Sequence, residues 1–179
     1  MSNAEPCGQC QLMARPYSQL YAPFLYEFPT DQLITGLKFQ RRVVFARAIA
    51  EAFEPQCSAQ LRAVDLLVPV PLHWSRHWRR GFNQSELILR FLCKDGLPPV
   101  SARALLRKRR TRAQSSLDLE ARQANVAGAF VACEKTVAGK SIGLLDDVVT
   151  TGATVSQAGE ALLSGGALSV CVFAIARAA

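Results

Sequence analysis

The sequence lacks the features that would place it in several common classes of protein. No apolar run approaches the ~20 residues needed to cross a bilayer, because Arg, Asp, Pro or Gly interrupts each one. No segment has the Gly-Lys-Ser/Thr ending of a Walker A loop or the Gly-x-Gly-x-x-Gly turn of a dinucleotide site. We therefore expect a soluble protein without membrane insertion and without either of these nucleotide-binding loops.

Histidine is scarce and forms no catalytic arrangement. The only two histidines, His73 and His77, each precede a tryptophan, and their four-residue spacing is more typical of surface packing than of metal binding. No Ser-His-Asp or Cys-His arrangement accompanies them. We therefore assign no catalytic role to the histidines.

The six cysteines argue against a disulfide framework, because only Cys7 and Cys10 are closely spaced. Cys93 and Cys171 lie in apolar stretches, where a reduced cysteine behaves as a small hydrophobe, and no secretion signal is recognisable, so we expect a cytoplasmic protein. Cys7 and Cys10 have the spacing of a zinc knuckle, but tetrahedral zinc takes four ligands and the other cysteines are scattered. A complete zinc site is not expected.

Positive charge is in excess and is concentrated in two segments. The chain of 179 residues, a length typical of one domain, has 21 Lys and Arg against 14 Asp and Glu, a net charge of +7. The basic segments are residues 76–80 and 103–112. They suit nucleic acid, nucleotides, pyrophosphate or a solvated surface, and the charge alone does not choose among these.

Apolar patterning predicts strands that alternate with helices. This order indicates an α/β fold with a central, mostly parallel sheet flanked by helices and a ligand crevice at the carboxyl ends of the strands. Residues 108–123 have no clear core face and are predicted to form a mobile loop or exposed hairpin. The expected strands are residues 21–28, 64–70, 100–106, 141–145 and 167–176, and the expected helices are one that follows a cap at Thr30 or Asp31 and residues 41–53, 83–94 and 154–164.

The segment of residues 142–154 carries the clearest chemical signal. A predicted buried strand ends in Asp146 and Asp147, and a Thr/Gly loop then opens a helix. A loop that enters a helix presents backbone N–H groups and the positive end of the helix dipole, so it suits a phosphate. The two carboxylates can accept hydrogen bonds from vicinal hydroxyls. Together these groups predict a site for a phosphorylated ribose, although a capping loop with two acidic residues would explain any one of them.

The sequence Asp-Asp-Val-Val-Thr-Thr-Gly-Ala-Thr resembles the phosphoribosyl pyrophosphate signature of type I phosphoribosyltransferases. Most of the chain is also similar to the competence protein ComF and GntX-like branch of that fold. The residues that carry this likeness are Leu-Lys-Phe at 37–39, Val-Pro-Val-Pro-Leu at 68–72, Arg-Gly-Phe-Asn-Gln at 80–84, a polar run from Arg107 to Arg122, and Asn-Val-Ala-Gly-Ala-Phe at 125–130.

The resemblance implies roles for individual residues. Asp146 and Asp147 would hold the ribose hydroxyls, act in catalysis and help to place Mg²⁺. The loop after the strand that ends at Val70 would bind pyrophosphate, although a solvated arginine remains the alternative for each arginine there. The other implied ligand contacts are Val148, Thr150, Thr151, Gly152, Ala153 and Thr154 for phosphoribosyl pyrophosphate, and Leu72, His73, Arg76 and Arg80 for pyrophosphate.

The resemblance also implies a polar loop that closes over the reacting centre, with Arg109 as a catalytic residue and Gln114 beside it. It divides the chain into residues 1–4, which look like an expression scar, residues 5–15, the remnant of a truncated zinc ribbon, and residues 16–179, a phosphoribosyltransferase-like domain with a small N-terminal hood-like element. Zinc, held in part by Cys7 and Cys10, would belong only to the untruncated protein.

Two functions are compatible with these residues. The first is a phosphoribosyltransferase that moves phosphoribose from phosphoribosyl pyrophosphate to an unidentified acceptor, with a role in DNA uptake or in the use of DNA as a nutrient. The alternative is a non-catalytic module of the DNA-uptake machinery that binds a nucleotide, single-stranded DNA or a partner such as a helicase. Aromatic side chains near the basic segments are few, which weakens the case for single-strand recognition. Assembly into an oligomer is open.

Overall fold

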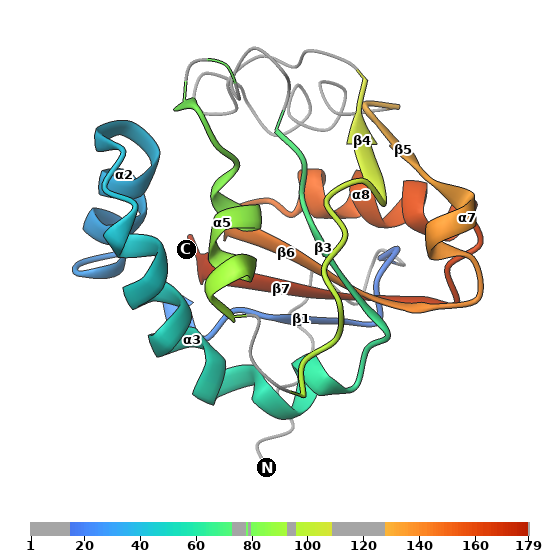
Figure 1. Ribbon diagram of the computed structural model, residues 1–179, viewed down its shortest axis with the longest axis horizontal. Helices are drawn as coiled ribbons and strands as arrows, with labels where there is room; N and C mark the ends of the chain where they lie inside the picture. The colour runs from blue at the N-terminus through green and yellow to red at the C-terminus, as the bar shows by residue number, and fades with distance from the viewer. Residues whose placement is uncertain (1–14, 73–77, 79, 93–95, 109–127, 179) are drawn as a thin grey trace.

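The computed structural model describes residues 15–72, 78, 80–92, 96–108 and 128–178, and a parallel sheet forms its centre (Figure 1). The strands lie in the order β1 (Gln19–Tyr21), β7 (Ser169–Arg177), β6 (Ser141–Val149) and β3 (Leu66–Pro69), and β2 (Phe24–Leu25) continues beside β7 after β1. Every pairing in this sheet is parallel. The predicted α/β fold with a parallel sheet is therefore confirmed.

The central strands are apolar on both faces, as expected for a sheet covered on two sides. Side chains alternate along each strand between two separate hydrophobic cores. In-register residues of neighbouring strands share a core: Val68, Leu144 and Val172 face one, and Leu145 and Phe173 face the other, together with Leu67 of β3.

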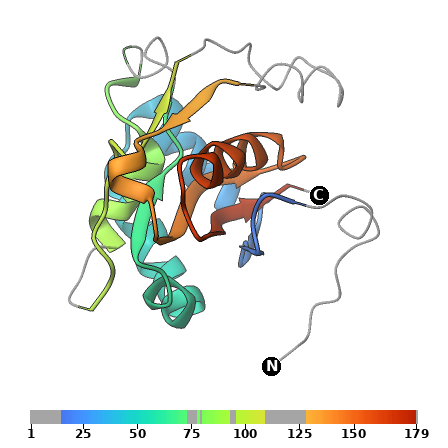
Figure 2. The same cartoon turned by 90° about the vertical axis from the view of Figure 1, so that its right-hand side faces the viewer.

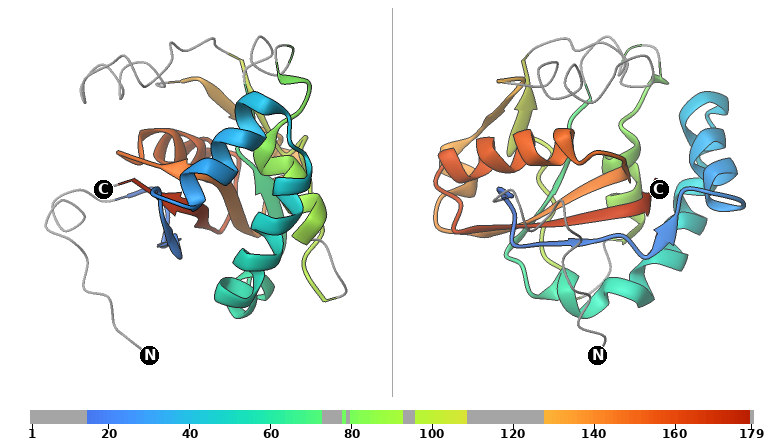
Figure 3. Two further views of the ribbon diagram at one scale, coloured as in Figure 1. Left: turned by 90° about the vertical axis from the view of Figure 1, so that its left-hand side faces the viewer. Right: turned by 180° about the vertical axis from the view of Figure 1, so that it is seen from behind.

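Three helices cover one face of the sheet: α2 (Thr30–Gln40), α3 (Val44–Arg62) and α5 (Gln84–Leu92) (Figure 3). The predicted helix over residues 41–53 is longer in the structure, because its apolar stripe continues. Phe53, Cys57 and Leu61 are four residues apart and all buried, so packing carries α3 through Pro55 to Arg62.

The opposite face carries α8 (Ala153–Ser164) and a separate antiparallel hairpin of β4 (Leu105–Arg107) and β5 (Phe130–Ala132), followed by the short helix α7 (Glu134–Val137) (Figure 2). Gly159 allows the chain that leads into β1 to lie directly on α8. A Cβ atom at this position would be 2.5 Å from the backbone oxygen of Pro16. The sequence pattern did not predict β5 or α7, which are only three and four residues long.

Three predicted strands differ from those observed. The predicted strand over residues 21–28 is two short strands, β1 and β2, with residues 26–28 outside them. The predicted strand over residues 100–106 pairs with the main sheet only at Val100, and regular pairing begins at Leu105, in the hairpin. β6 continues four residues beyond its predicted end at Leu145, because Asp146, Val148 and Val149 stay in register with β7.

Within the described residues, no helix combines the length and the hydropathy that a membrane-spanning segment requires. The predicted loop over residues 108–123 lies outside the described part of the chain except for Lys108.

Candidate functional site

The topology opens a crevice between the carboxyl ends of β3 and β6. After β3 the chain passes through α5, on one face, to Val100, which pairs on the outer side of β3. After β6 it passes through α8, on the other face, to β7. Connections that leave two adjacent parallel strands in opposite directions mark the point where α/β proteins bind ligands. The two loops predicted to bind phosphate and pyrophosphate both start at this edge.

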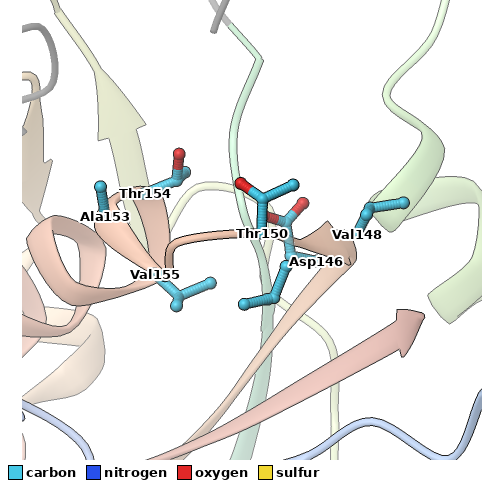
Figure 4. Close-up of a pocket in the computed structure, with 8 residues that line it drawn as sticks. Asp146, Val148, Thr150, Ala153, Thr154 and Val155 are labelled. Atoms are coloured by element: carbon cyan, nitrogen blue, oxygen red, sulfur yellow. The ribbon is translucent and has the colours of Figure 1, made fainter. Parts of the chain in front are cut away.

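A small pocket lies at this edge, where β6 gives way to α8 (Figure 4). It encloses about 190 Å³, including the part open to solvent. In Figure 4 the side-chain oxygens of Asp146, Thr150 and Thr154 point to the same side of the connecting loop. The lining residues are Asp146, Val148, Val149, Thr150, Gly152, Ala153, Thr154 and Val155. The structure thus brings together six of the residues predicted to contact phosphoribosyl pyrophosphate.

The loop has the backbone of an anion-binding turn. Gly152 precedes the first residue of α8 and has φ 79°, which a residue with a Cβ atom rarely adopts. The Thr151 hydroxyl accepts a hydrogen bond from the Ala153 N–H at 3.4 Å, which orders the turn. The first turn of a helix directs N–H groups and the positive end of the helix dipole toward its N-terminus. The pocket therefore favours a negatively charged ligand.

The acidic pair lies inside β6, and its two side chains have different surroundings. Successive residues of a strand point to opposite faces. Asp146 lines the pocket, whereas Asp147 forms an ion pair with Lys38 of α2, with 2.9 Å between Nζ and Oδ1. The Asp147 N–H donates to Oδ1 of Asp146 at 2.9 Å. Asp147 and Thr151 are the two predicted contacts of this segment that do not line the pocket.

Asp146 holds its proton unusually tightly for a carboxyl group. Burial, and then the negative charge of Asp147, raise the pKa of Asp146 to about 7. The Asp147 N–H, Lys38 and Arg107 of β4 oppose this rise. A small change in the charge around Asp146 therefore alters its ionisation near neutral pH, which is a property of many functional carboxyl groups.

The loop after β3 is fixed at its far end by Asn83. Its Nδ2 donates to the backbone oxygen of Val70 at 3.0 Å, and its Oδ1 accepts from the N–H of Ser85 in the first turn of α5. Asn83 is therefore the N-terminal cap of that helix. Arg80, three residues earlier, lies over the ring of Phe39 in α2, with 5.2 Å from the guanidinium carbon to the ring centroid.

Most of the remaining predicted residues lie outside the described part of the chain. Leu72 is described at the start of the loop after β3 and is partly exposed. Those that lie outside the described residues are Cys7, Cys10, His73, Arg76, Arg109 and Gln114. Their roles stay predictions.

Sequence reasoning missed Lys38 and Arg107 as neighbours of the acidic pair. Lys38 is the middle residue of Leu-Lys-Phe at 37–39, and a lysine between two apolar residues on a helix could have suggested a buried charge partner. Leu37 is buried, but Phe39 is 65% exposed, so only one of the two apolar neighbours of Lys38 lies in the core. Arg107 carried no such signal, because it lies in a run of basic residues.

Metal binding by protein groups alone is not supported among the described residues, where no three His, Cys, Asp or Glu side chains cluster. Cys57, Cys133 and Cys171 are free thiols. Burial raises the pKa of Cys57 to about 11 and that of Cys171 to about 12, so both are unreactive at neutral pH.

The chain is similar to proteins named for DNA utilisation and for competence. It is 37% identical over 177 residues to the DNA utilization protein YhgH of Escherichia coli, covering 96% of this chain and 78% of that protein. It is 30% identical over 184 residues to the competence protein ComFC of Streptococcus pneumoniae (96% and 74%), and 28% identical over 182 residues to competence protein F of Haemophilus influenzae (98% and 80%). No family model matches.

The fold also resembles a solved structure of the allosteric regulatory enzyme of purine biosynthesis. The two superimpose with a TM-score of 0.47 and are 17% identical, over 73% of this chain and 25% of that chain. The sequence relatives decide the family: this protein belongs to the family of the DNA utilization protein YhgH and the competence proteins F and ComFC.

Proposed function

We propose that this protein binds phosphoribosyl pyrophosphate with Mg²⁺ in the pocket between β6 and α8 and transfers its phosphoribose to an acceptor, in a process of DNA uptake or utilisation. The names of the relatives support the biological setting. The chemistry is proposed from the site itself.

One observation carries this proposal: Asp146 and the first turn of α8 line the same pocket. The turn at Gly152 suits the 5′-phosphate, because it offers backbone N–H groups and the Thr150 and Thr154 hydroxyls. Asp146 lies beside it and accepts hydrogen bonds from hydroxyl groups. A carboxylate next to a phosphate site is the arrangement that a ribose 5-phosphate needs, since its phosphate and its ring hydroxyls are joined by a short carbon chain.

The residues present fit Mg²⁺ that arrives with its substrate. Mg²⁺ commonly binds through one or two carboxylates together with substrate phosphates and water, and needs no cage of three protein ligands. Asp146 and Asp147 are the two carboxylates at this edge. When bound, Mg²⁺ would offset the negative charge of the leaving pyrophosphate.

The protein's part in such a transfer is to position the ligand and stabilise charge. The bond between ribose C1 and the pyrophosphate oxygen breaks, its electron pair leaves with pyrophosphate, and the acceptor bonds to C1 and loses its proton. Arg80, at the loop after β3, would bind the negative leaving group. Asp146 would hold the ring hydroxyls while positive charge develops near C1.

The proposal is tested by calorimetric titration of phosphoribosyl pyrophosphate with Mg²⁺ into the wild type, Asp146→Asn and Glu160→Gln. Asp146→Asn keeps the size of the side chain but removes its charge, and Glu160→Gln makes the same change at an exposed position of α8. We expect binding by the wild type and Glu160→Gln, and at least about tenfold weaker binding by Asp146→Asn. A folded wild type that does not bind would overturn the proposal.

The alternative, a non-catalytic module that binds single-stranded DNA, is favoured by a different observation. Phe39 is 65% exposed beneath Arg80, and Trp78, two residues before Arg80, is 86% exposed. Exposed aromatic rings beside arginines are typical of surfaces on which bases stack. Fluorescence anisotropy with a labelled oligonucleotide would favour this function if affinity falls steeply with salt and with Phe39→Ala while phosphoribosyl pyrophosphate does not bind.

A further inference from the structure

We propose that Lys38 is a positioning residue for the ribose end of the ligand, and that α2 joins this end to the pyrophosphate end through the next residue, Phe39. This inference rests on the proposed function, because it assigns a role at the same site. It concerns a helix that contributes nothing to the pocket between β6 and α8.

The ion pair between Lys38 and Asp147 has the geometry of a fixed contact. Nζ is 2.9 Å from Oδ1, and the two side chains are 16% and 14% exposed, respectively. Two other ion pairs among the described residues, Arg47–Glu51 and Arg90–Glu86, each join side chains one turn apart on a helix, with the arginine about 70% exposed. Lys38 instead joins α2 to β6, and partial burial protects its contact from screening by salt.

The contact constrains the acidic pair. Asp147 does not line the pocket, but its N–H donates to Oδ1 of Asp146, which does. Lys38 contacts Oδ1 of Asp147 and so ties this part of β6 to α2. A carboxyl group held in one orientation by its neighbours accepts hydrogen bonds from a ligand in a defined direction.

The neighbouring residue of α2 reaches the other loop of the crevice. The Phe39 ring lies under the Arg80 guanidinium at 5.2 Å. Leu37, on the other side of Lys38, is buried in the core shared by α3 and α5, which fixes the helix against the sheet. Three consecutive residues of α2 therefore contact the core, the acidic pair and the loop after β3. The helix sets the spacing between the two ends of the site.

The experiment compares Lys38→Met with Arg47→Met, which breaks an exposed ion pair of the same kind on α3. Three probes are titrated by calorimetry: ribose 5-phosphate, 2-deoxyribose 5-phosphate and pyrophosphate. We expect Lys38→Met to bind ribose 5-phosphate about tenfold more weakly than the wild type does. Its affinity for 2-deoxyribose 5-phosphate should fall less, and its affinity for pyrophosphate should change by less than about twofold. Arg47→Met should match the wild type on all three probes.

Two further variants separate positioning from folding. Lys38→Gln can still donate a hydrogen bond to Asp147 and should recover part of the lost affinity for ribose 5-phosphate, and it replaces Lys38→Met if that variant does not fold. Phe39→Leu should lower the affinity for pyrophosphate by about threefold and leave the affinity for ribose 5-phosphate unchanged.

The outcomes distinguish this inference from the proposed function. A wild type that binds none of the probes would overturn both. If Lys38→Met binds ribose 5-phosphate as tightly as the wild type does, the role of Lys38 alone is overturned. Equal losses of affinity for all three probes would show a general effect on the fold, which also contradicts positioning.

Discussion

Arg107 lies over the ring of Phe130, with its guanidinium carbon 5.1 Å from the ring centroid. The two residues are directly paired across the hairpin of β4 and β5. Arg107 and Phe130 are therefore side by side, although they are far apart in sequence. The positive charge of Arg107 lowers the pKa of Asp146. Residues 109–127, which include most of the polar loop predicted to close over the reacting centre, lie outside the described part of the chain.

Replacing Arg107 with glutamine should raise the pKa of Asp146 further above its ordinary value, because a nearby positive charge is removed. If the ionised carboxyl group binds the ligand, the pH at which affinity reaches half of its maximum should move upward. Calorimetric titration of phosphoribosyl pyrophosphate with Mg²⁺ between pH 6 and pH 9 measures this midpoint. Arg103→Gln, an exposed position just before β4, is the matched control. An identical midpoint in Arg107→Gln and the wild type would contradict the prediction.

Gly152→Ala should damage the phosphate turn by two effects. The residue has φ 79°, where a Cβ atom costs about 1 to 2 kcal/mol, and the added atom would be 3.3 Å from Nη1 of Arg15. Gly139→Ala is the matched control, since Gly139 has φ 71° but no atom within 4 Å of the added Cβ. Urea unfolding should show both variants destabilised by about 1 to 2 kcal/mol. Only Gly152→Ala should lose affinity for inorganic phosphate, and equal affinities would argue against a phosphate site at this turn.

The parallel sheet and the loop between β6 and α8 could be predicted from the sequence, because their signals are local. Residues 64–70 and 141–145 are short apolar runs bounded by turn residues, and Gly152 follows two threonines before a helical stripe. The predicted end of β6 was wrong for the same reason, because a local signal was all that the prediction used. A pair of aspartates reads as the end of a strand, but pairing with β7 extends β6 through both of them, and this pairing joins residues far apart in sequence.

The partners of the acidic pair could not be predicted from local patterns. Lys38 is more than 100 positions away from Asp147, and only the packing of α2 on the sheet brings the two together. Arg107 reaches the site through the hairpin with β5, a strand of three residues without a recognisable period. Contacts of this kind depend on tertiary structure, and the resemblance of Leu-Lys-Phe to known relatives marked the segment without indicating its contact.

The raised pKa of Asp146 makes stability depend on pH in a defined direction. Its pKa is about 7 in the folded protein, against an ordinary value of 3.8, so the folded state holds a proton that the unfolded state releases between these values. The contribution of Asp146 to stability is therefore complete below about pH 4 and is lost as the pH rises toward 7.

Asp146→Asn cannot ionise, while its side-chain oxygen can still accept the hydrogen bond from the Asp147 N–H. Relative to the wild type, the variant should gain about 4 kcal/mol in free energy of unfolding between pH 4 and pH 8. Urea unfolding at both pH values measures this gain. A difference between the two proteins that does not change with pH would mean that folding leaves the pKa of Asp146 at its ordinary value, and that the Lys38 and Arg107 charges offset its burial.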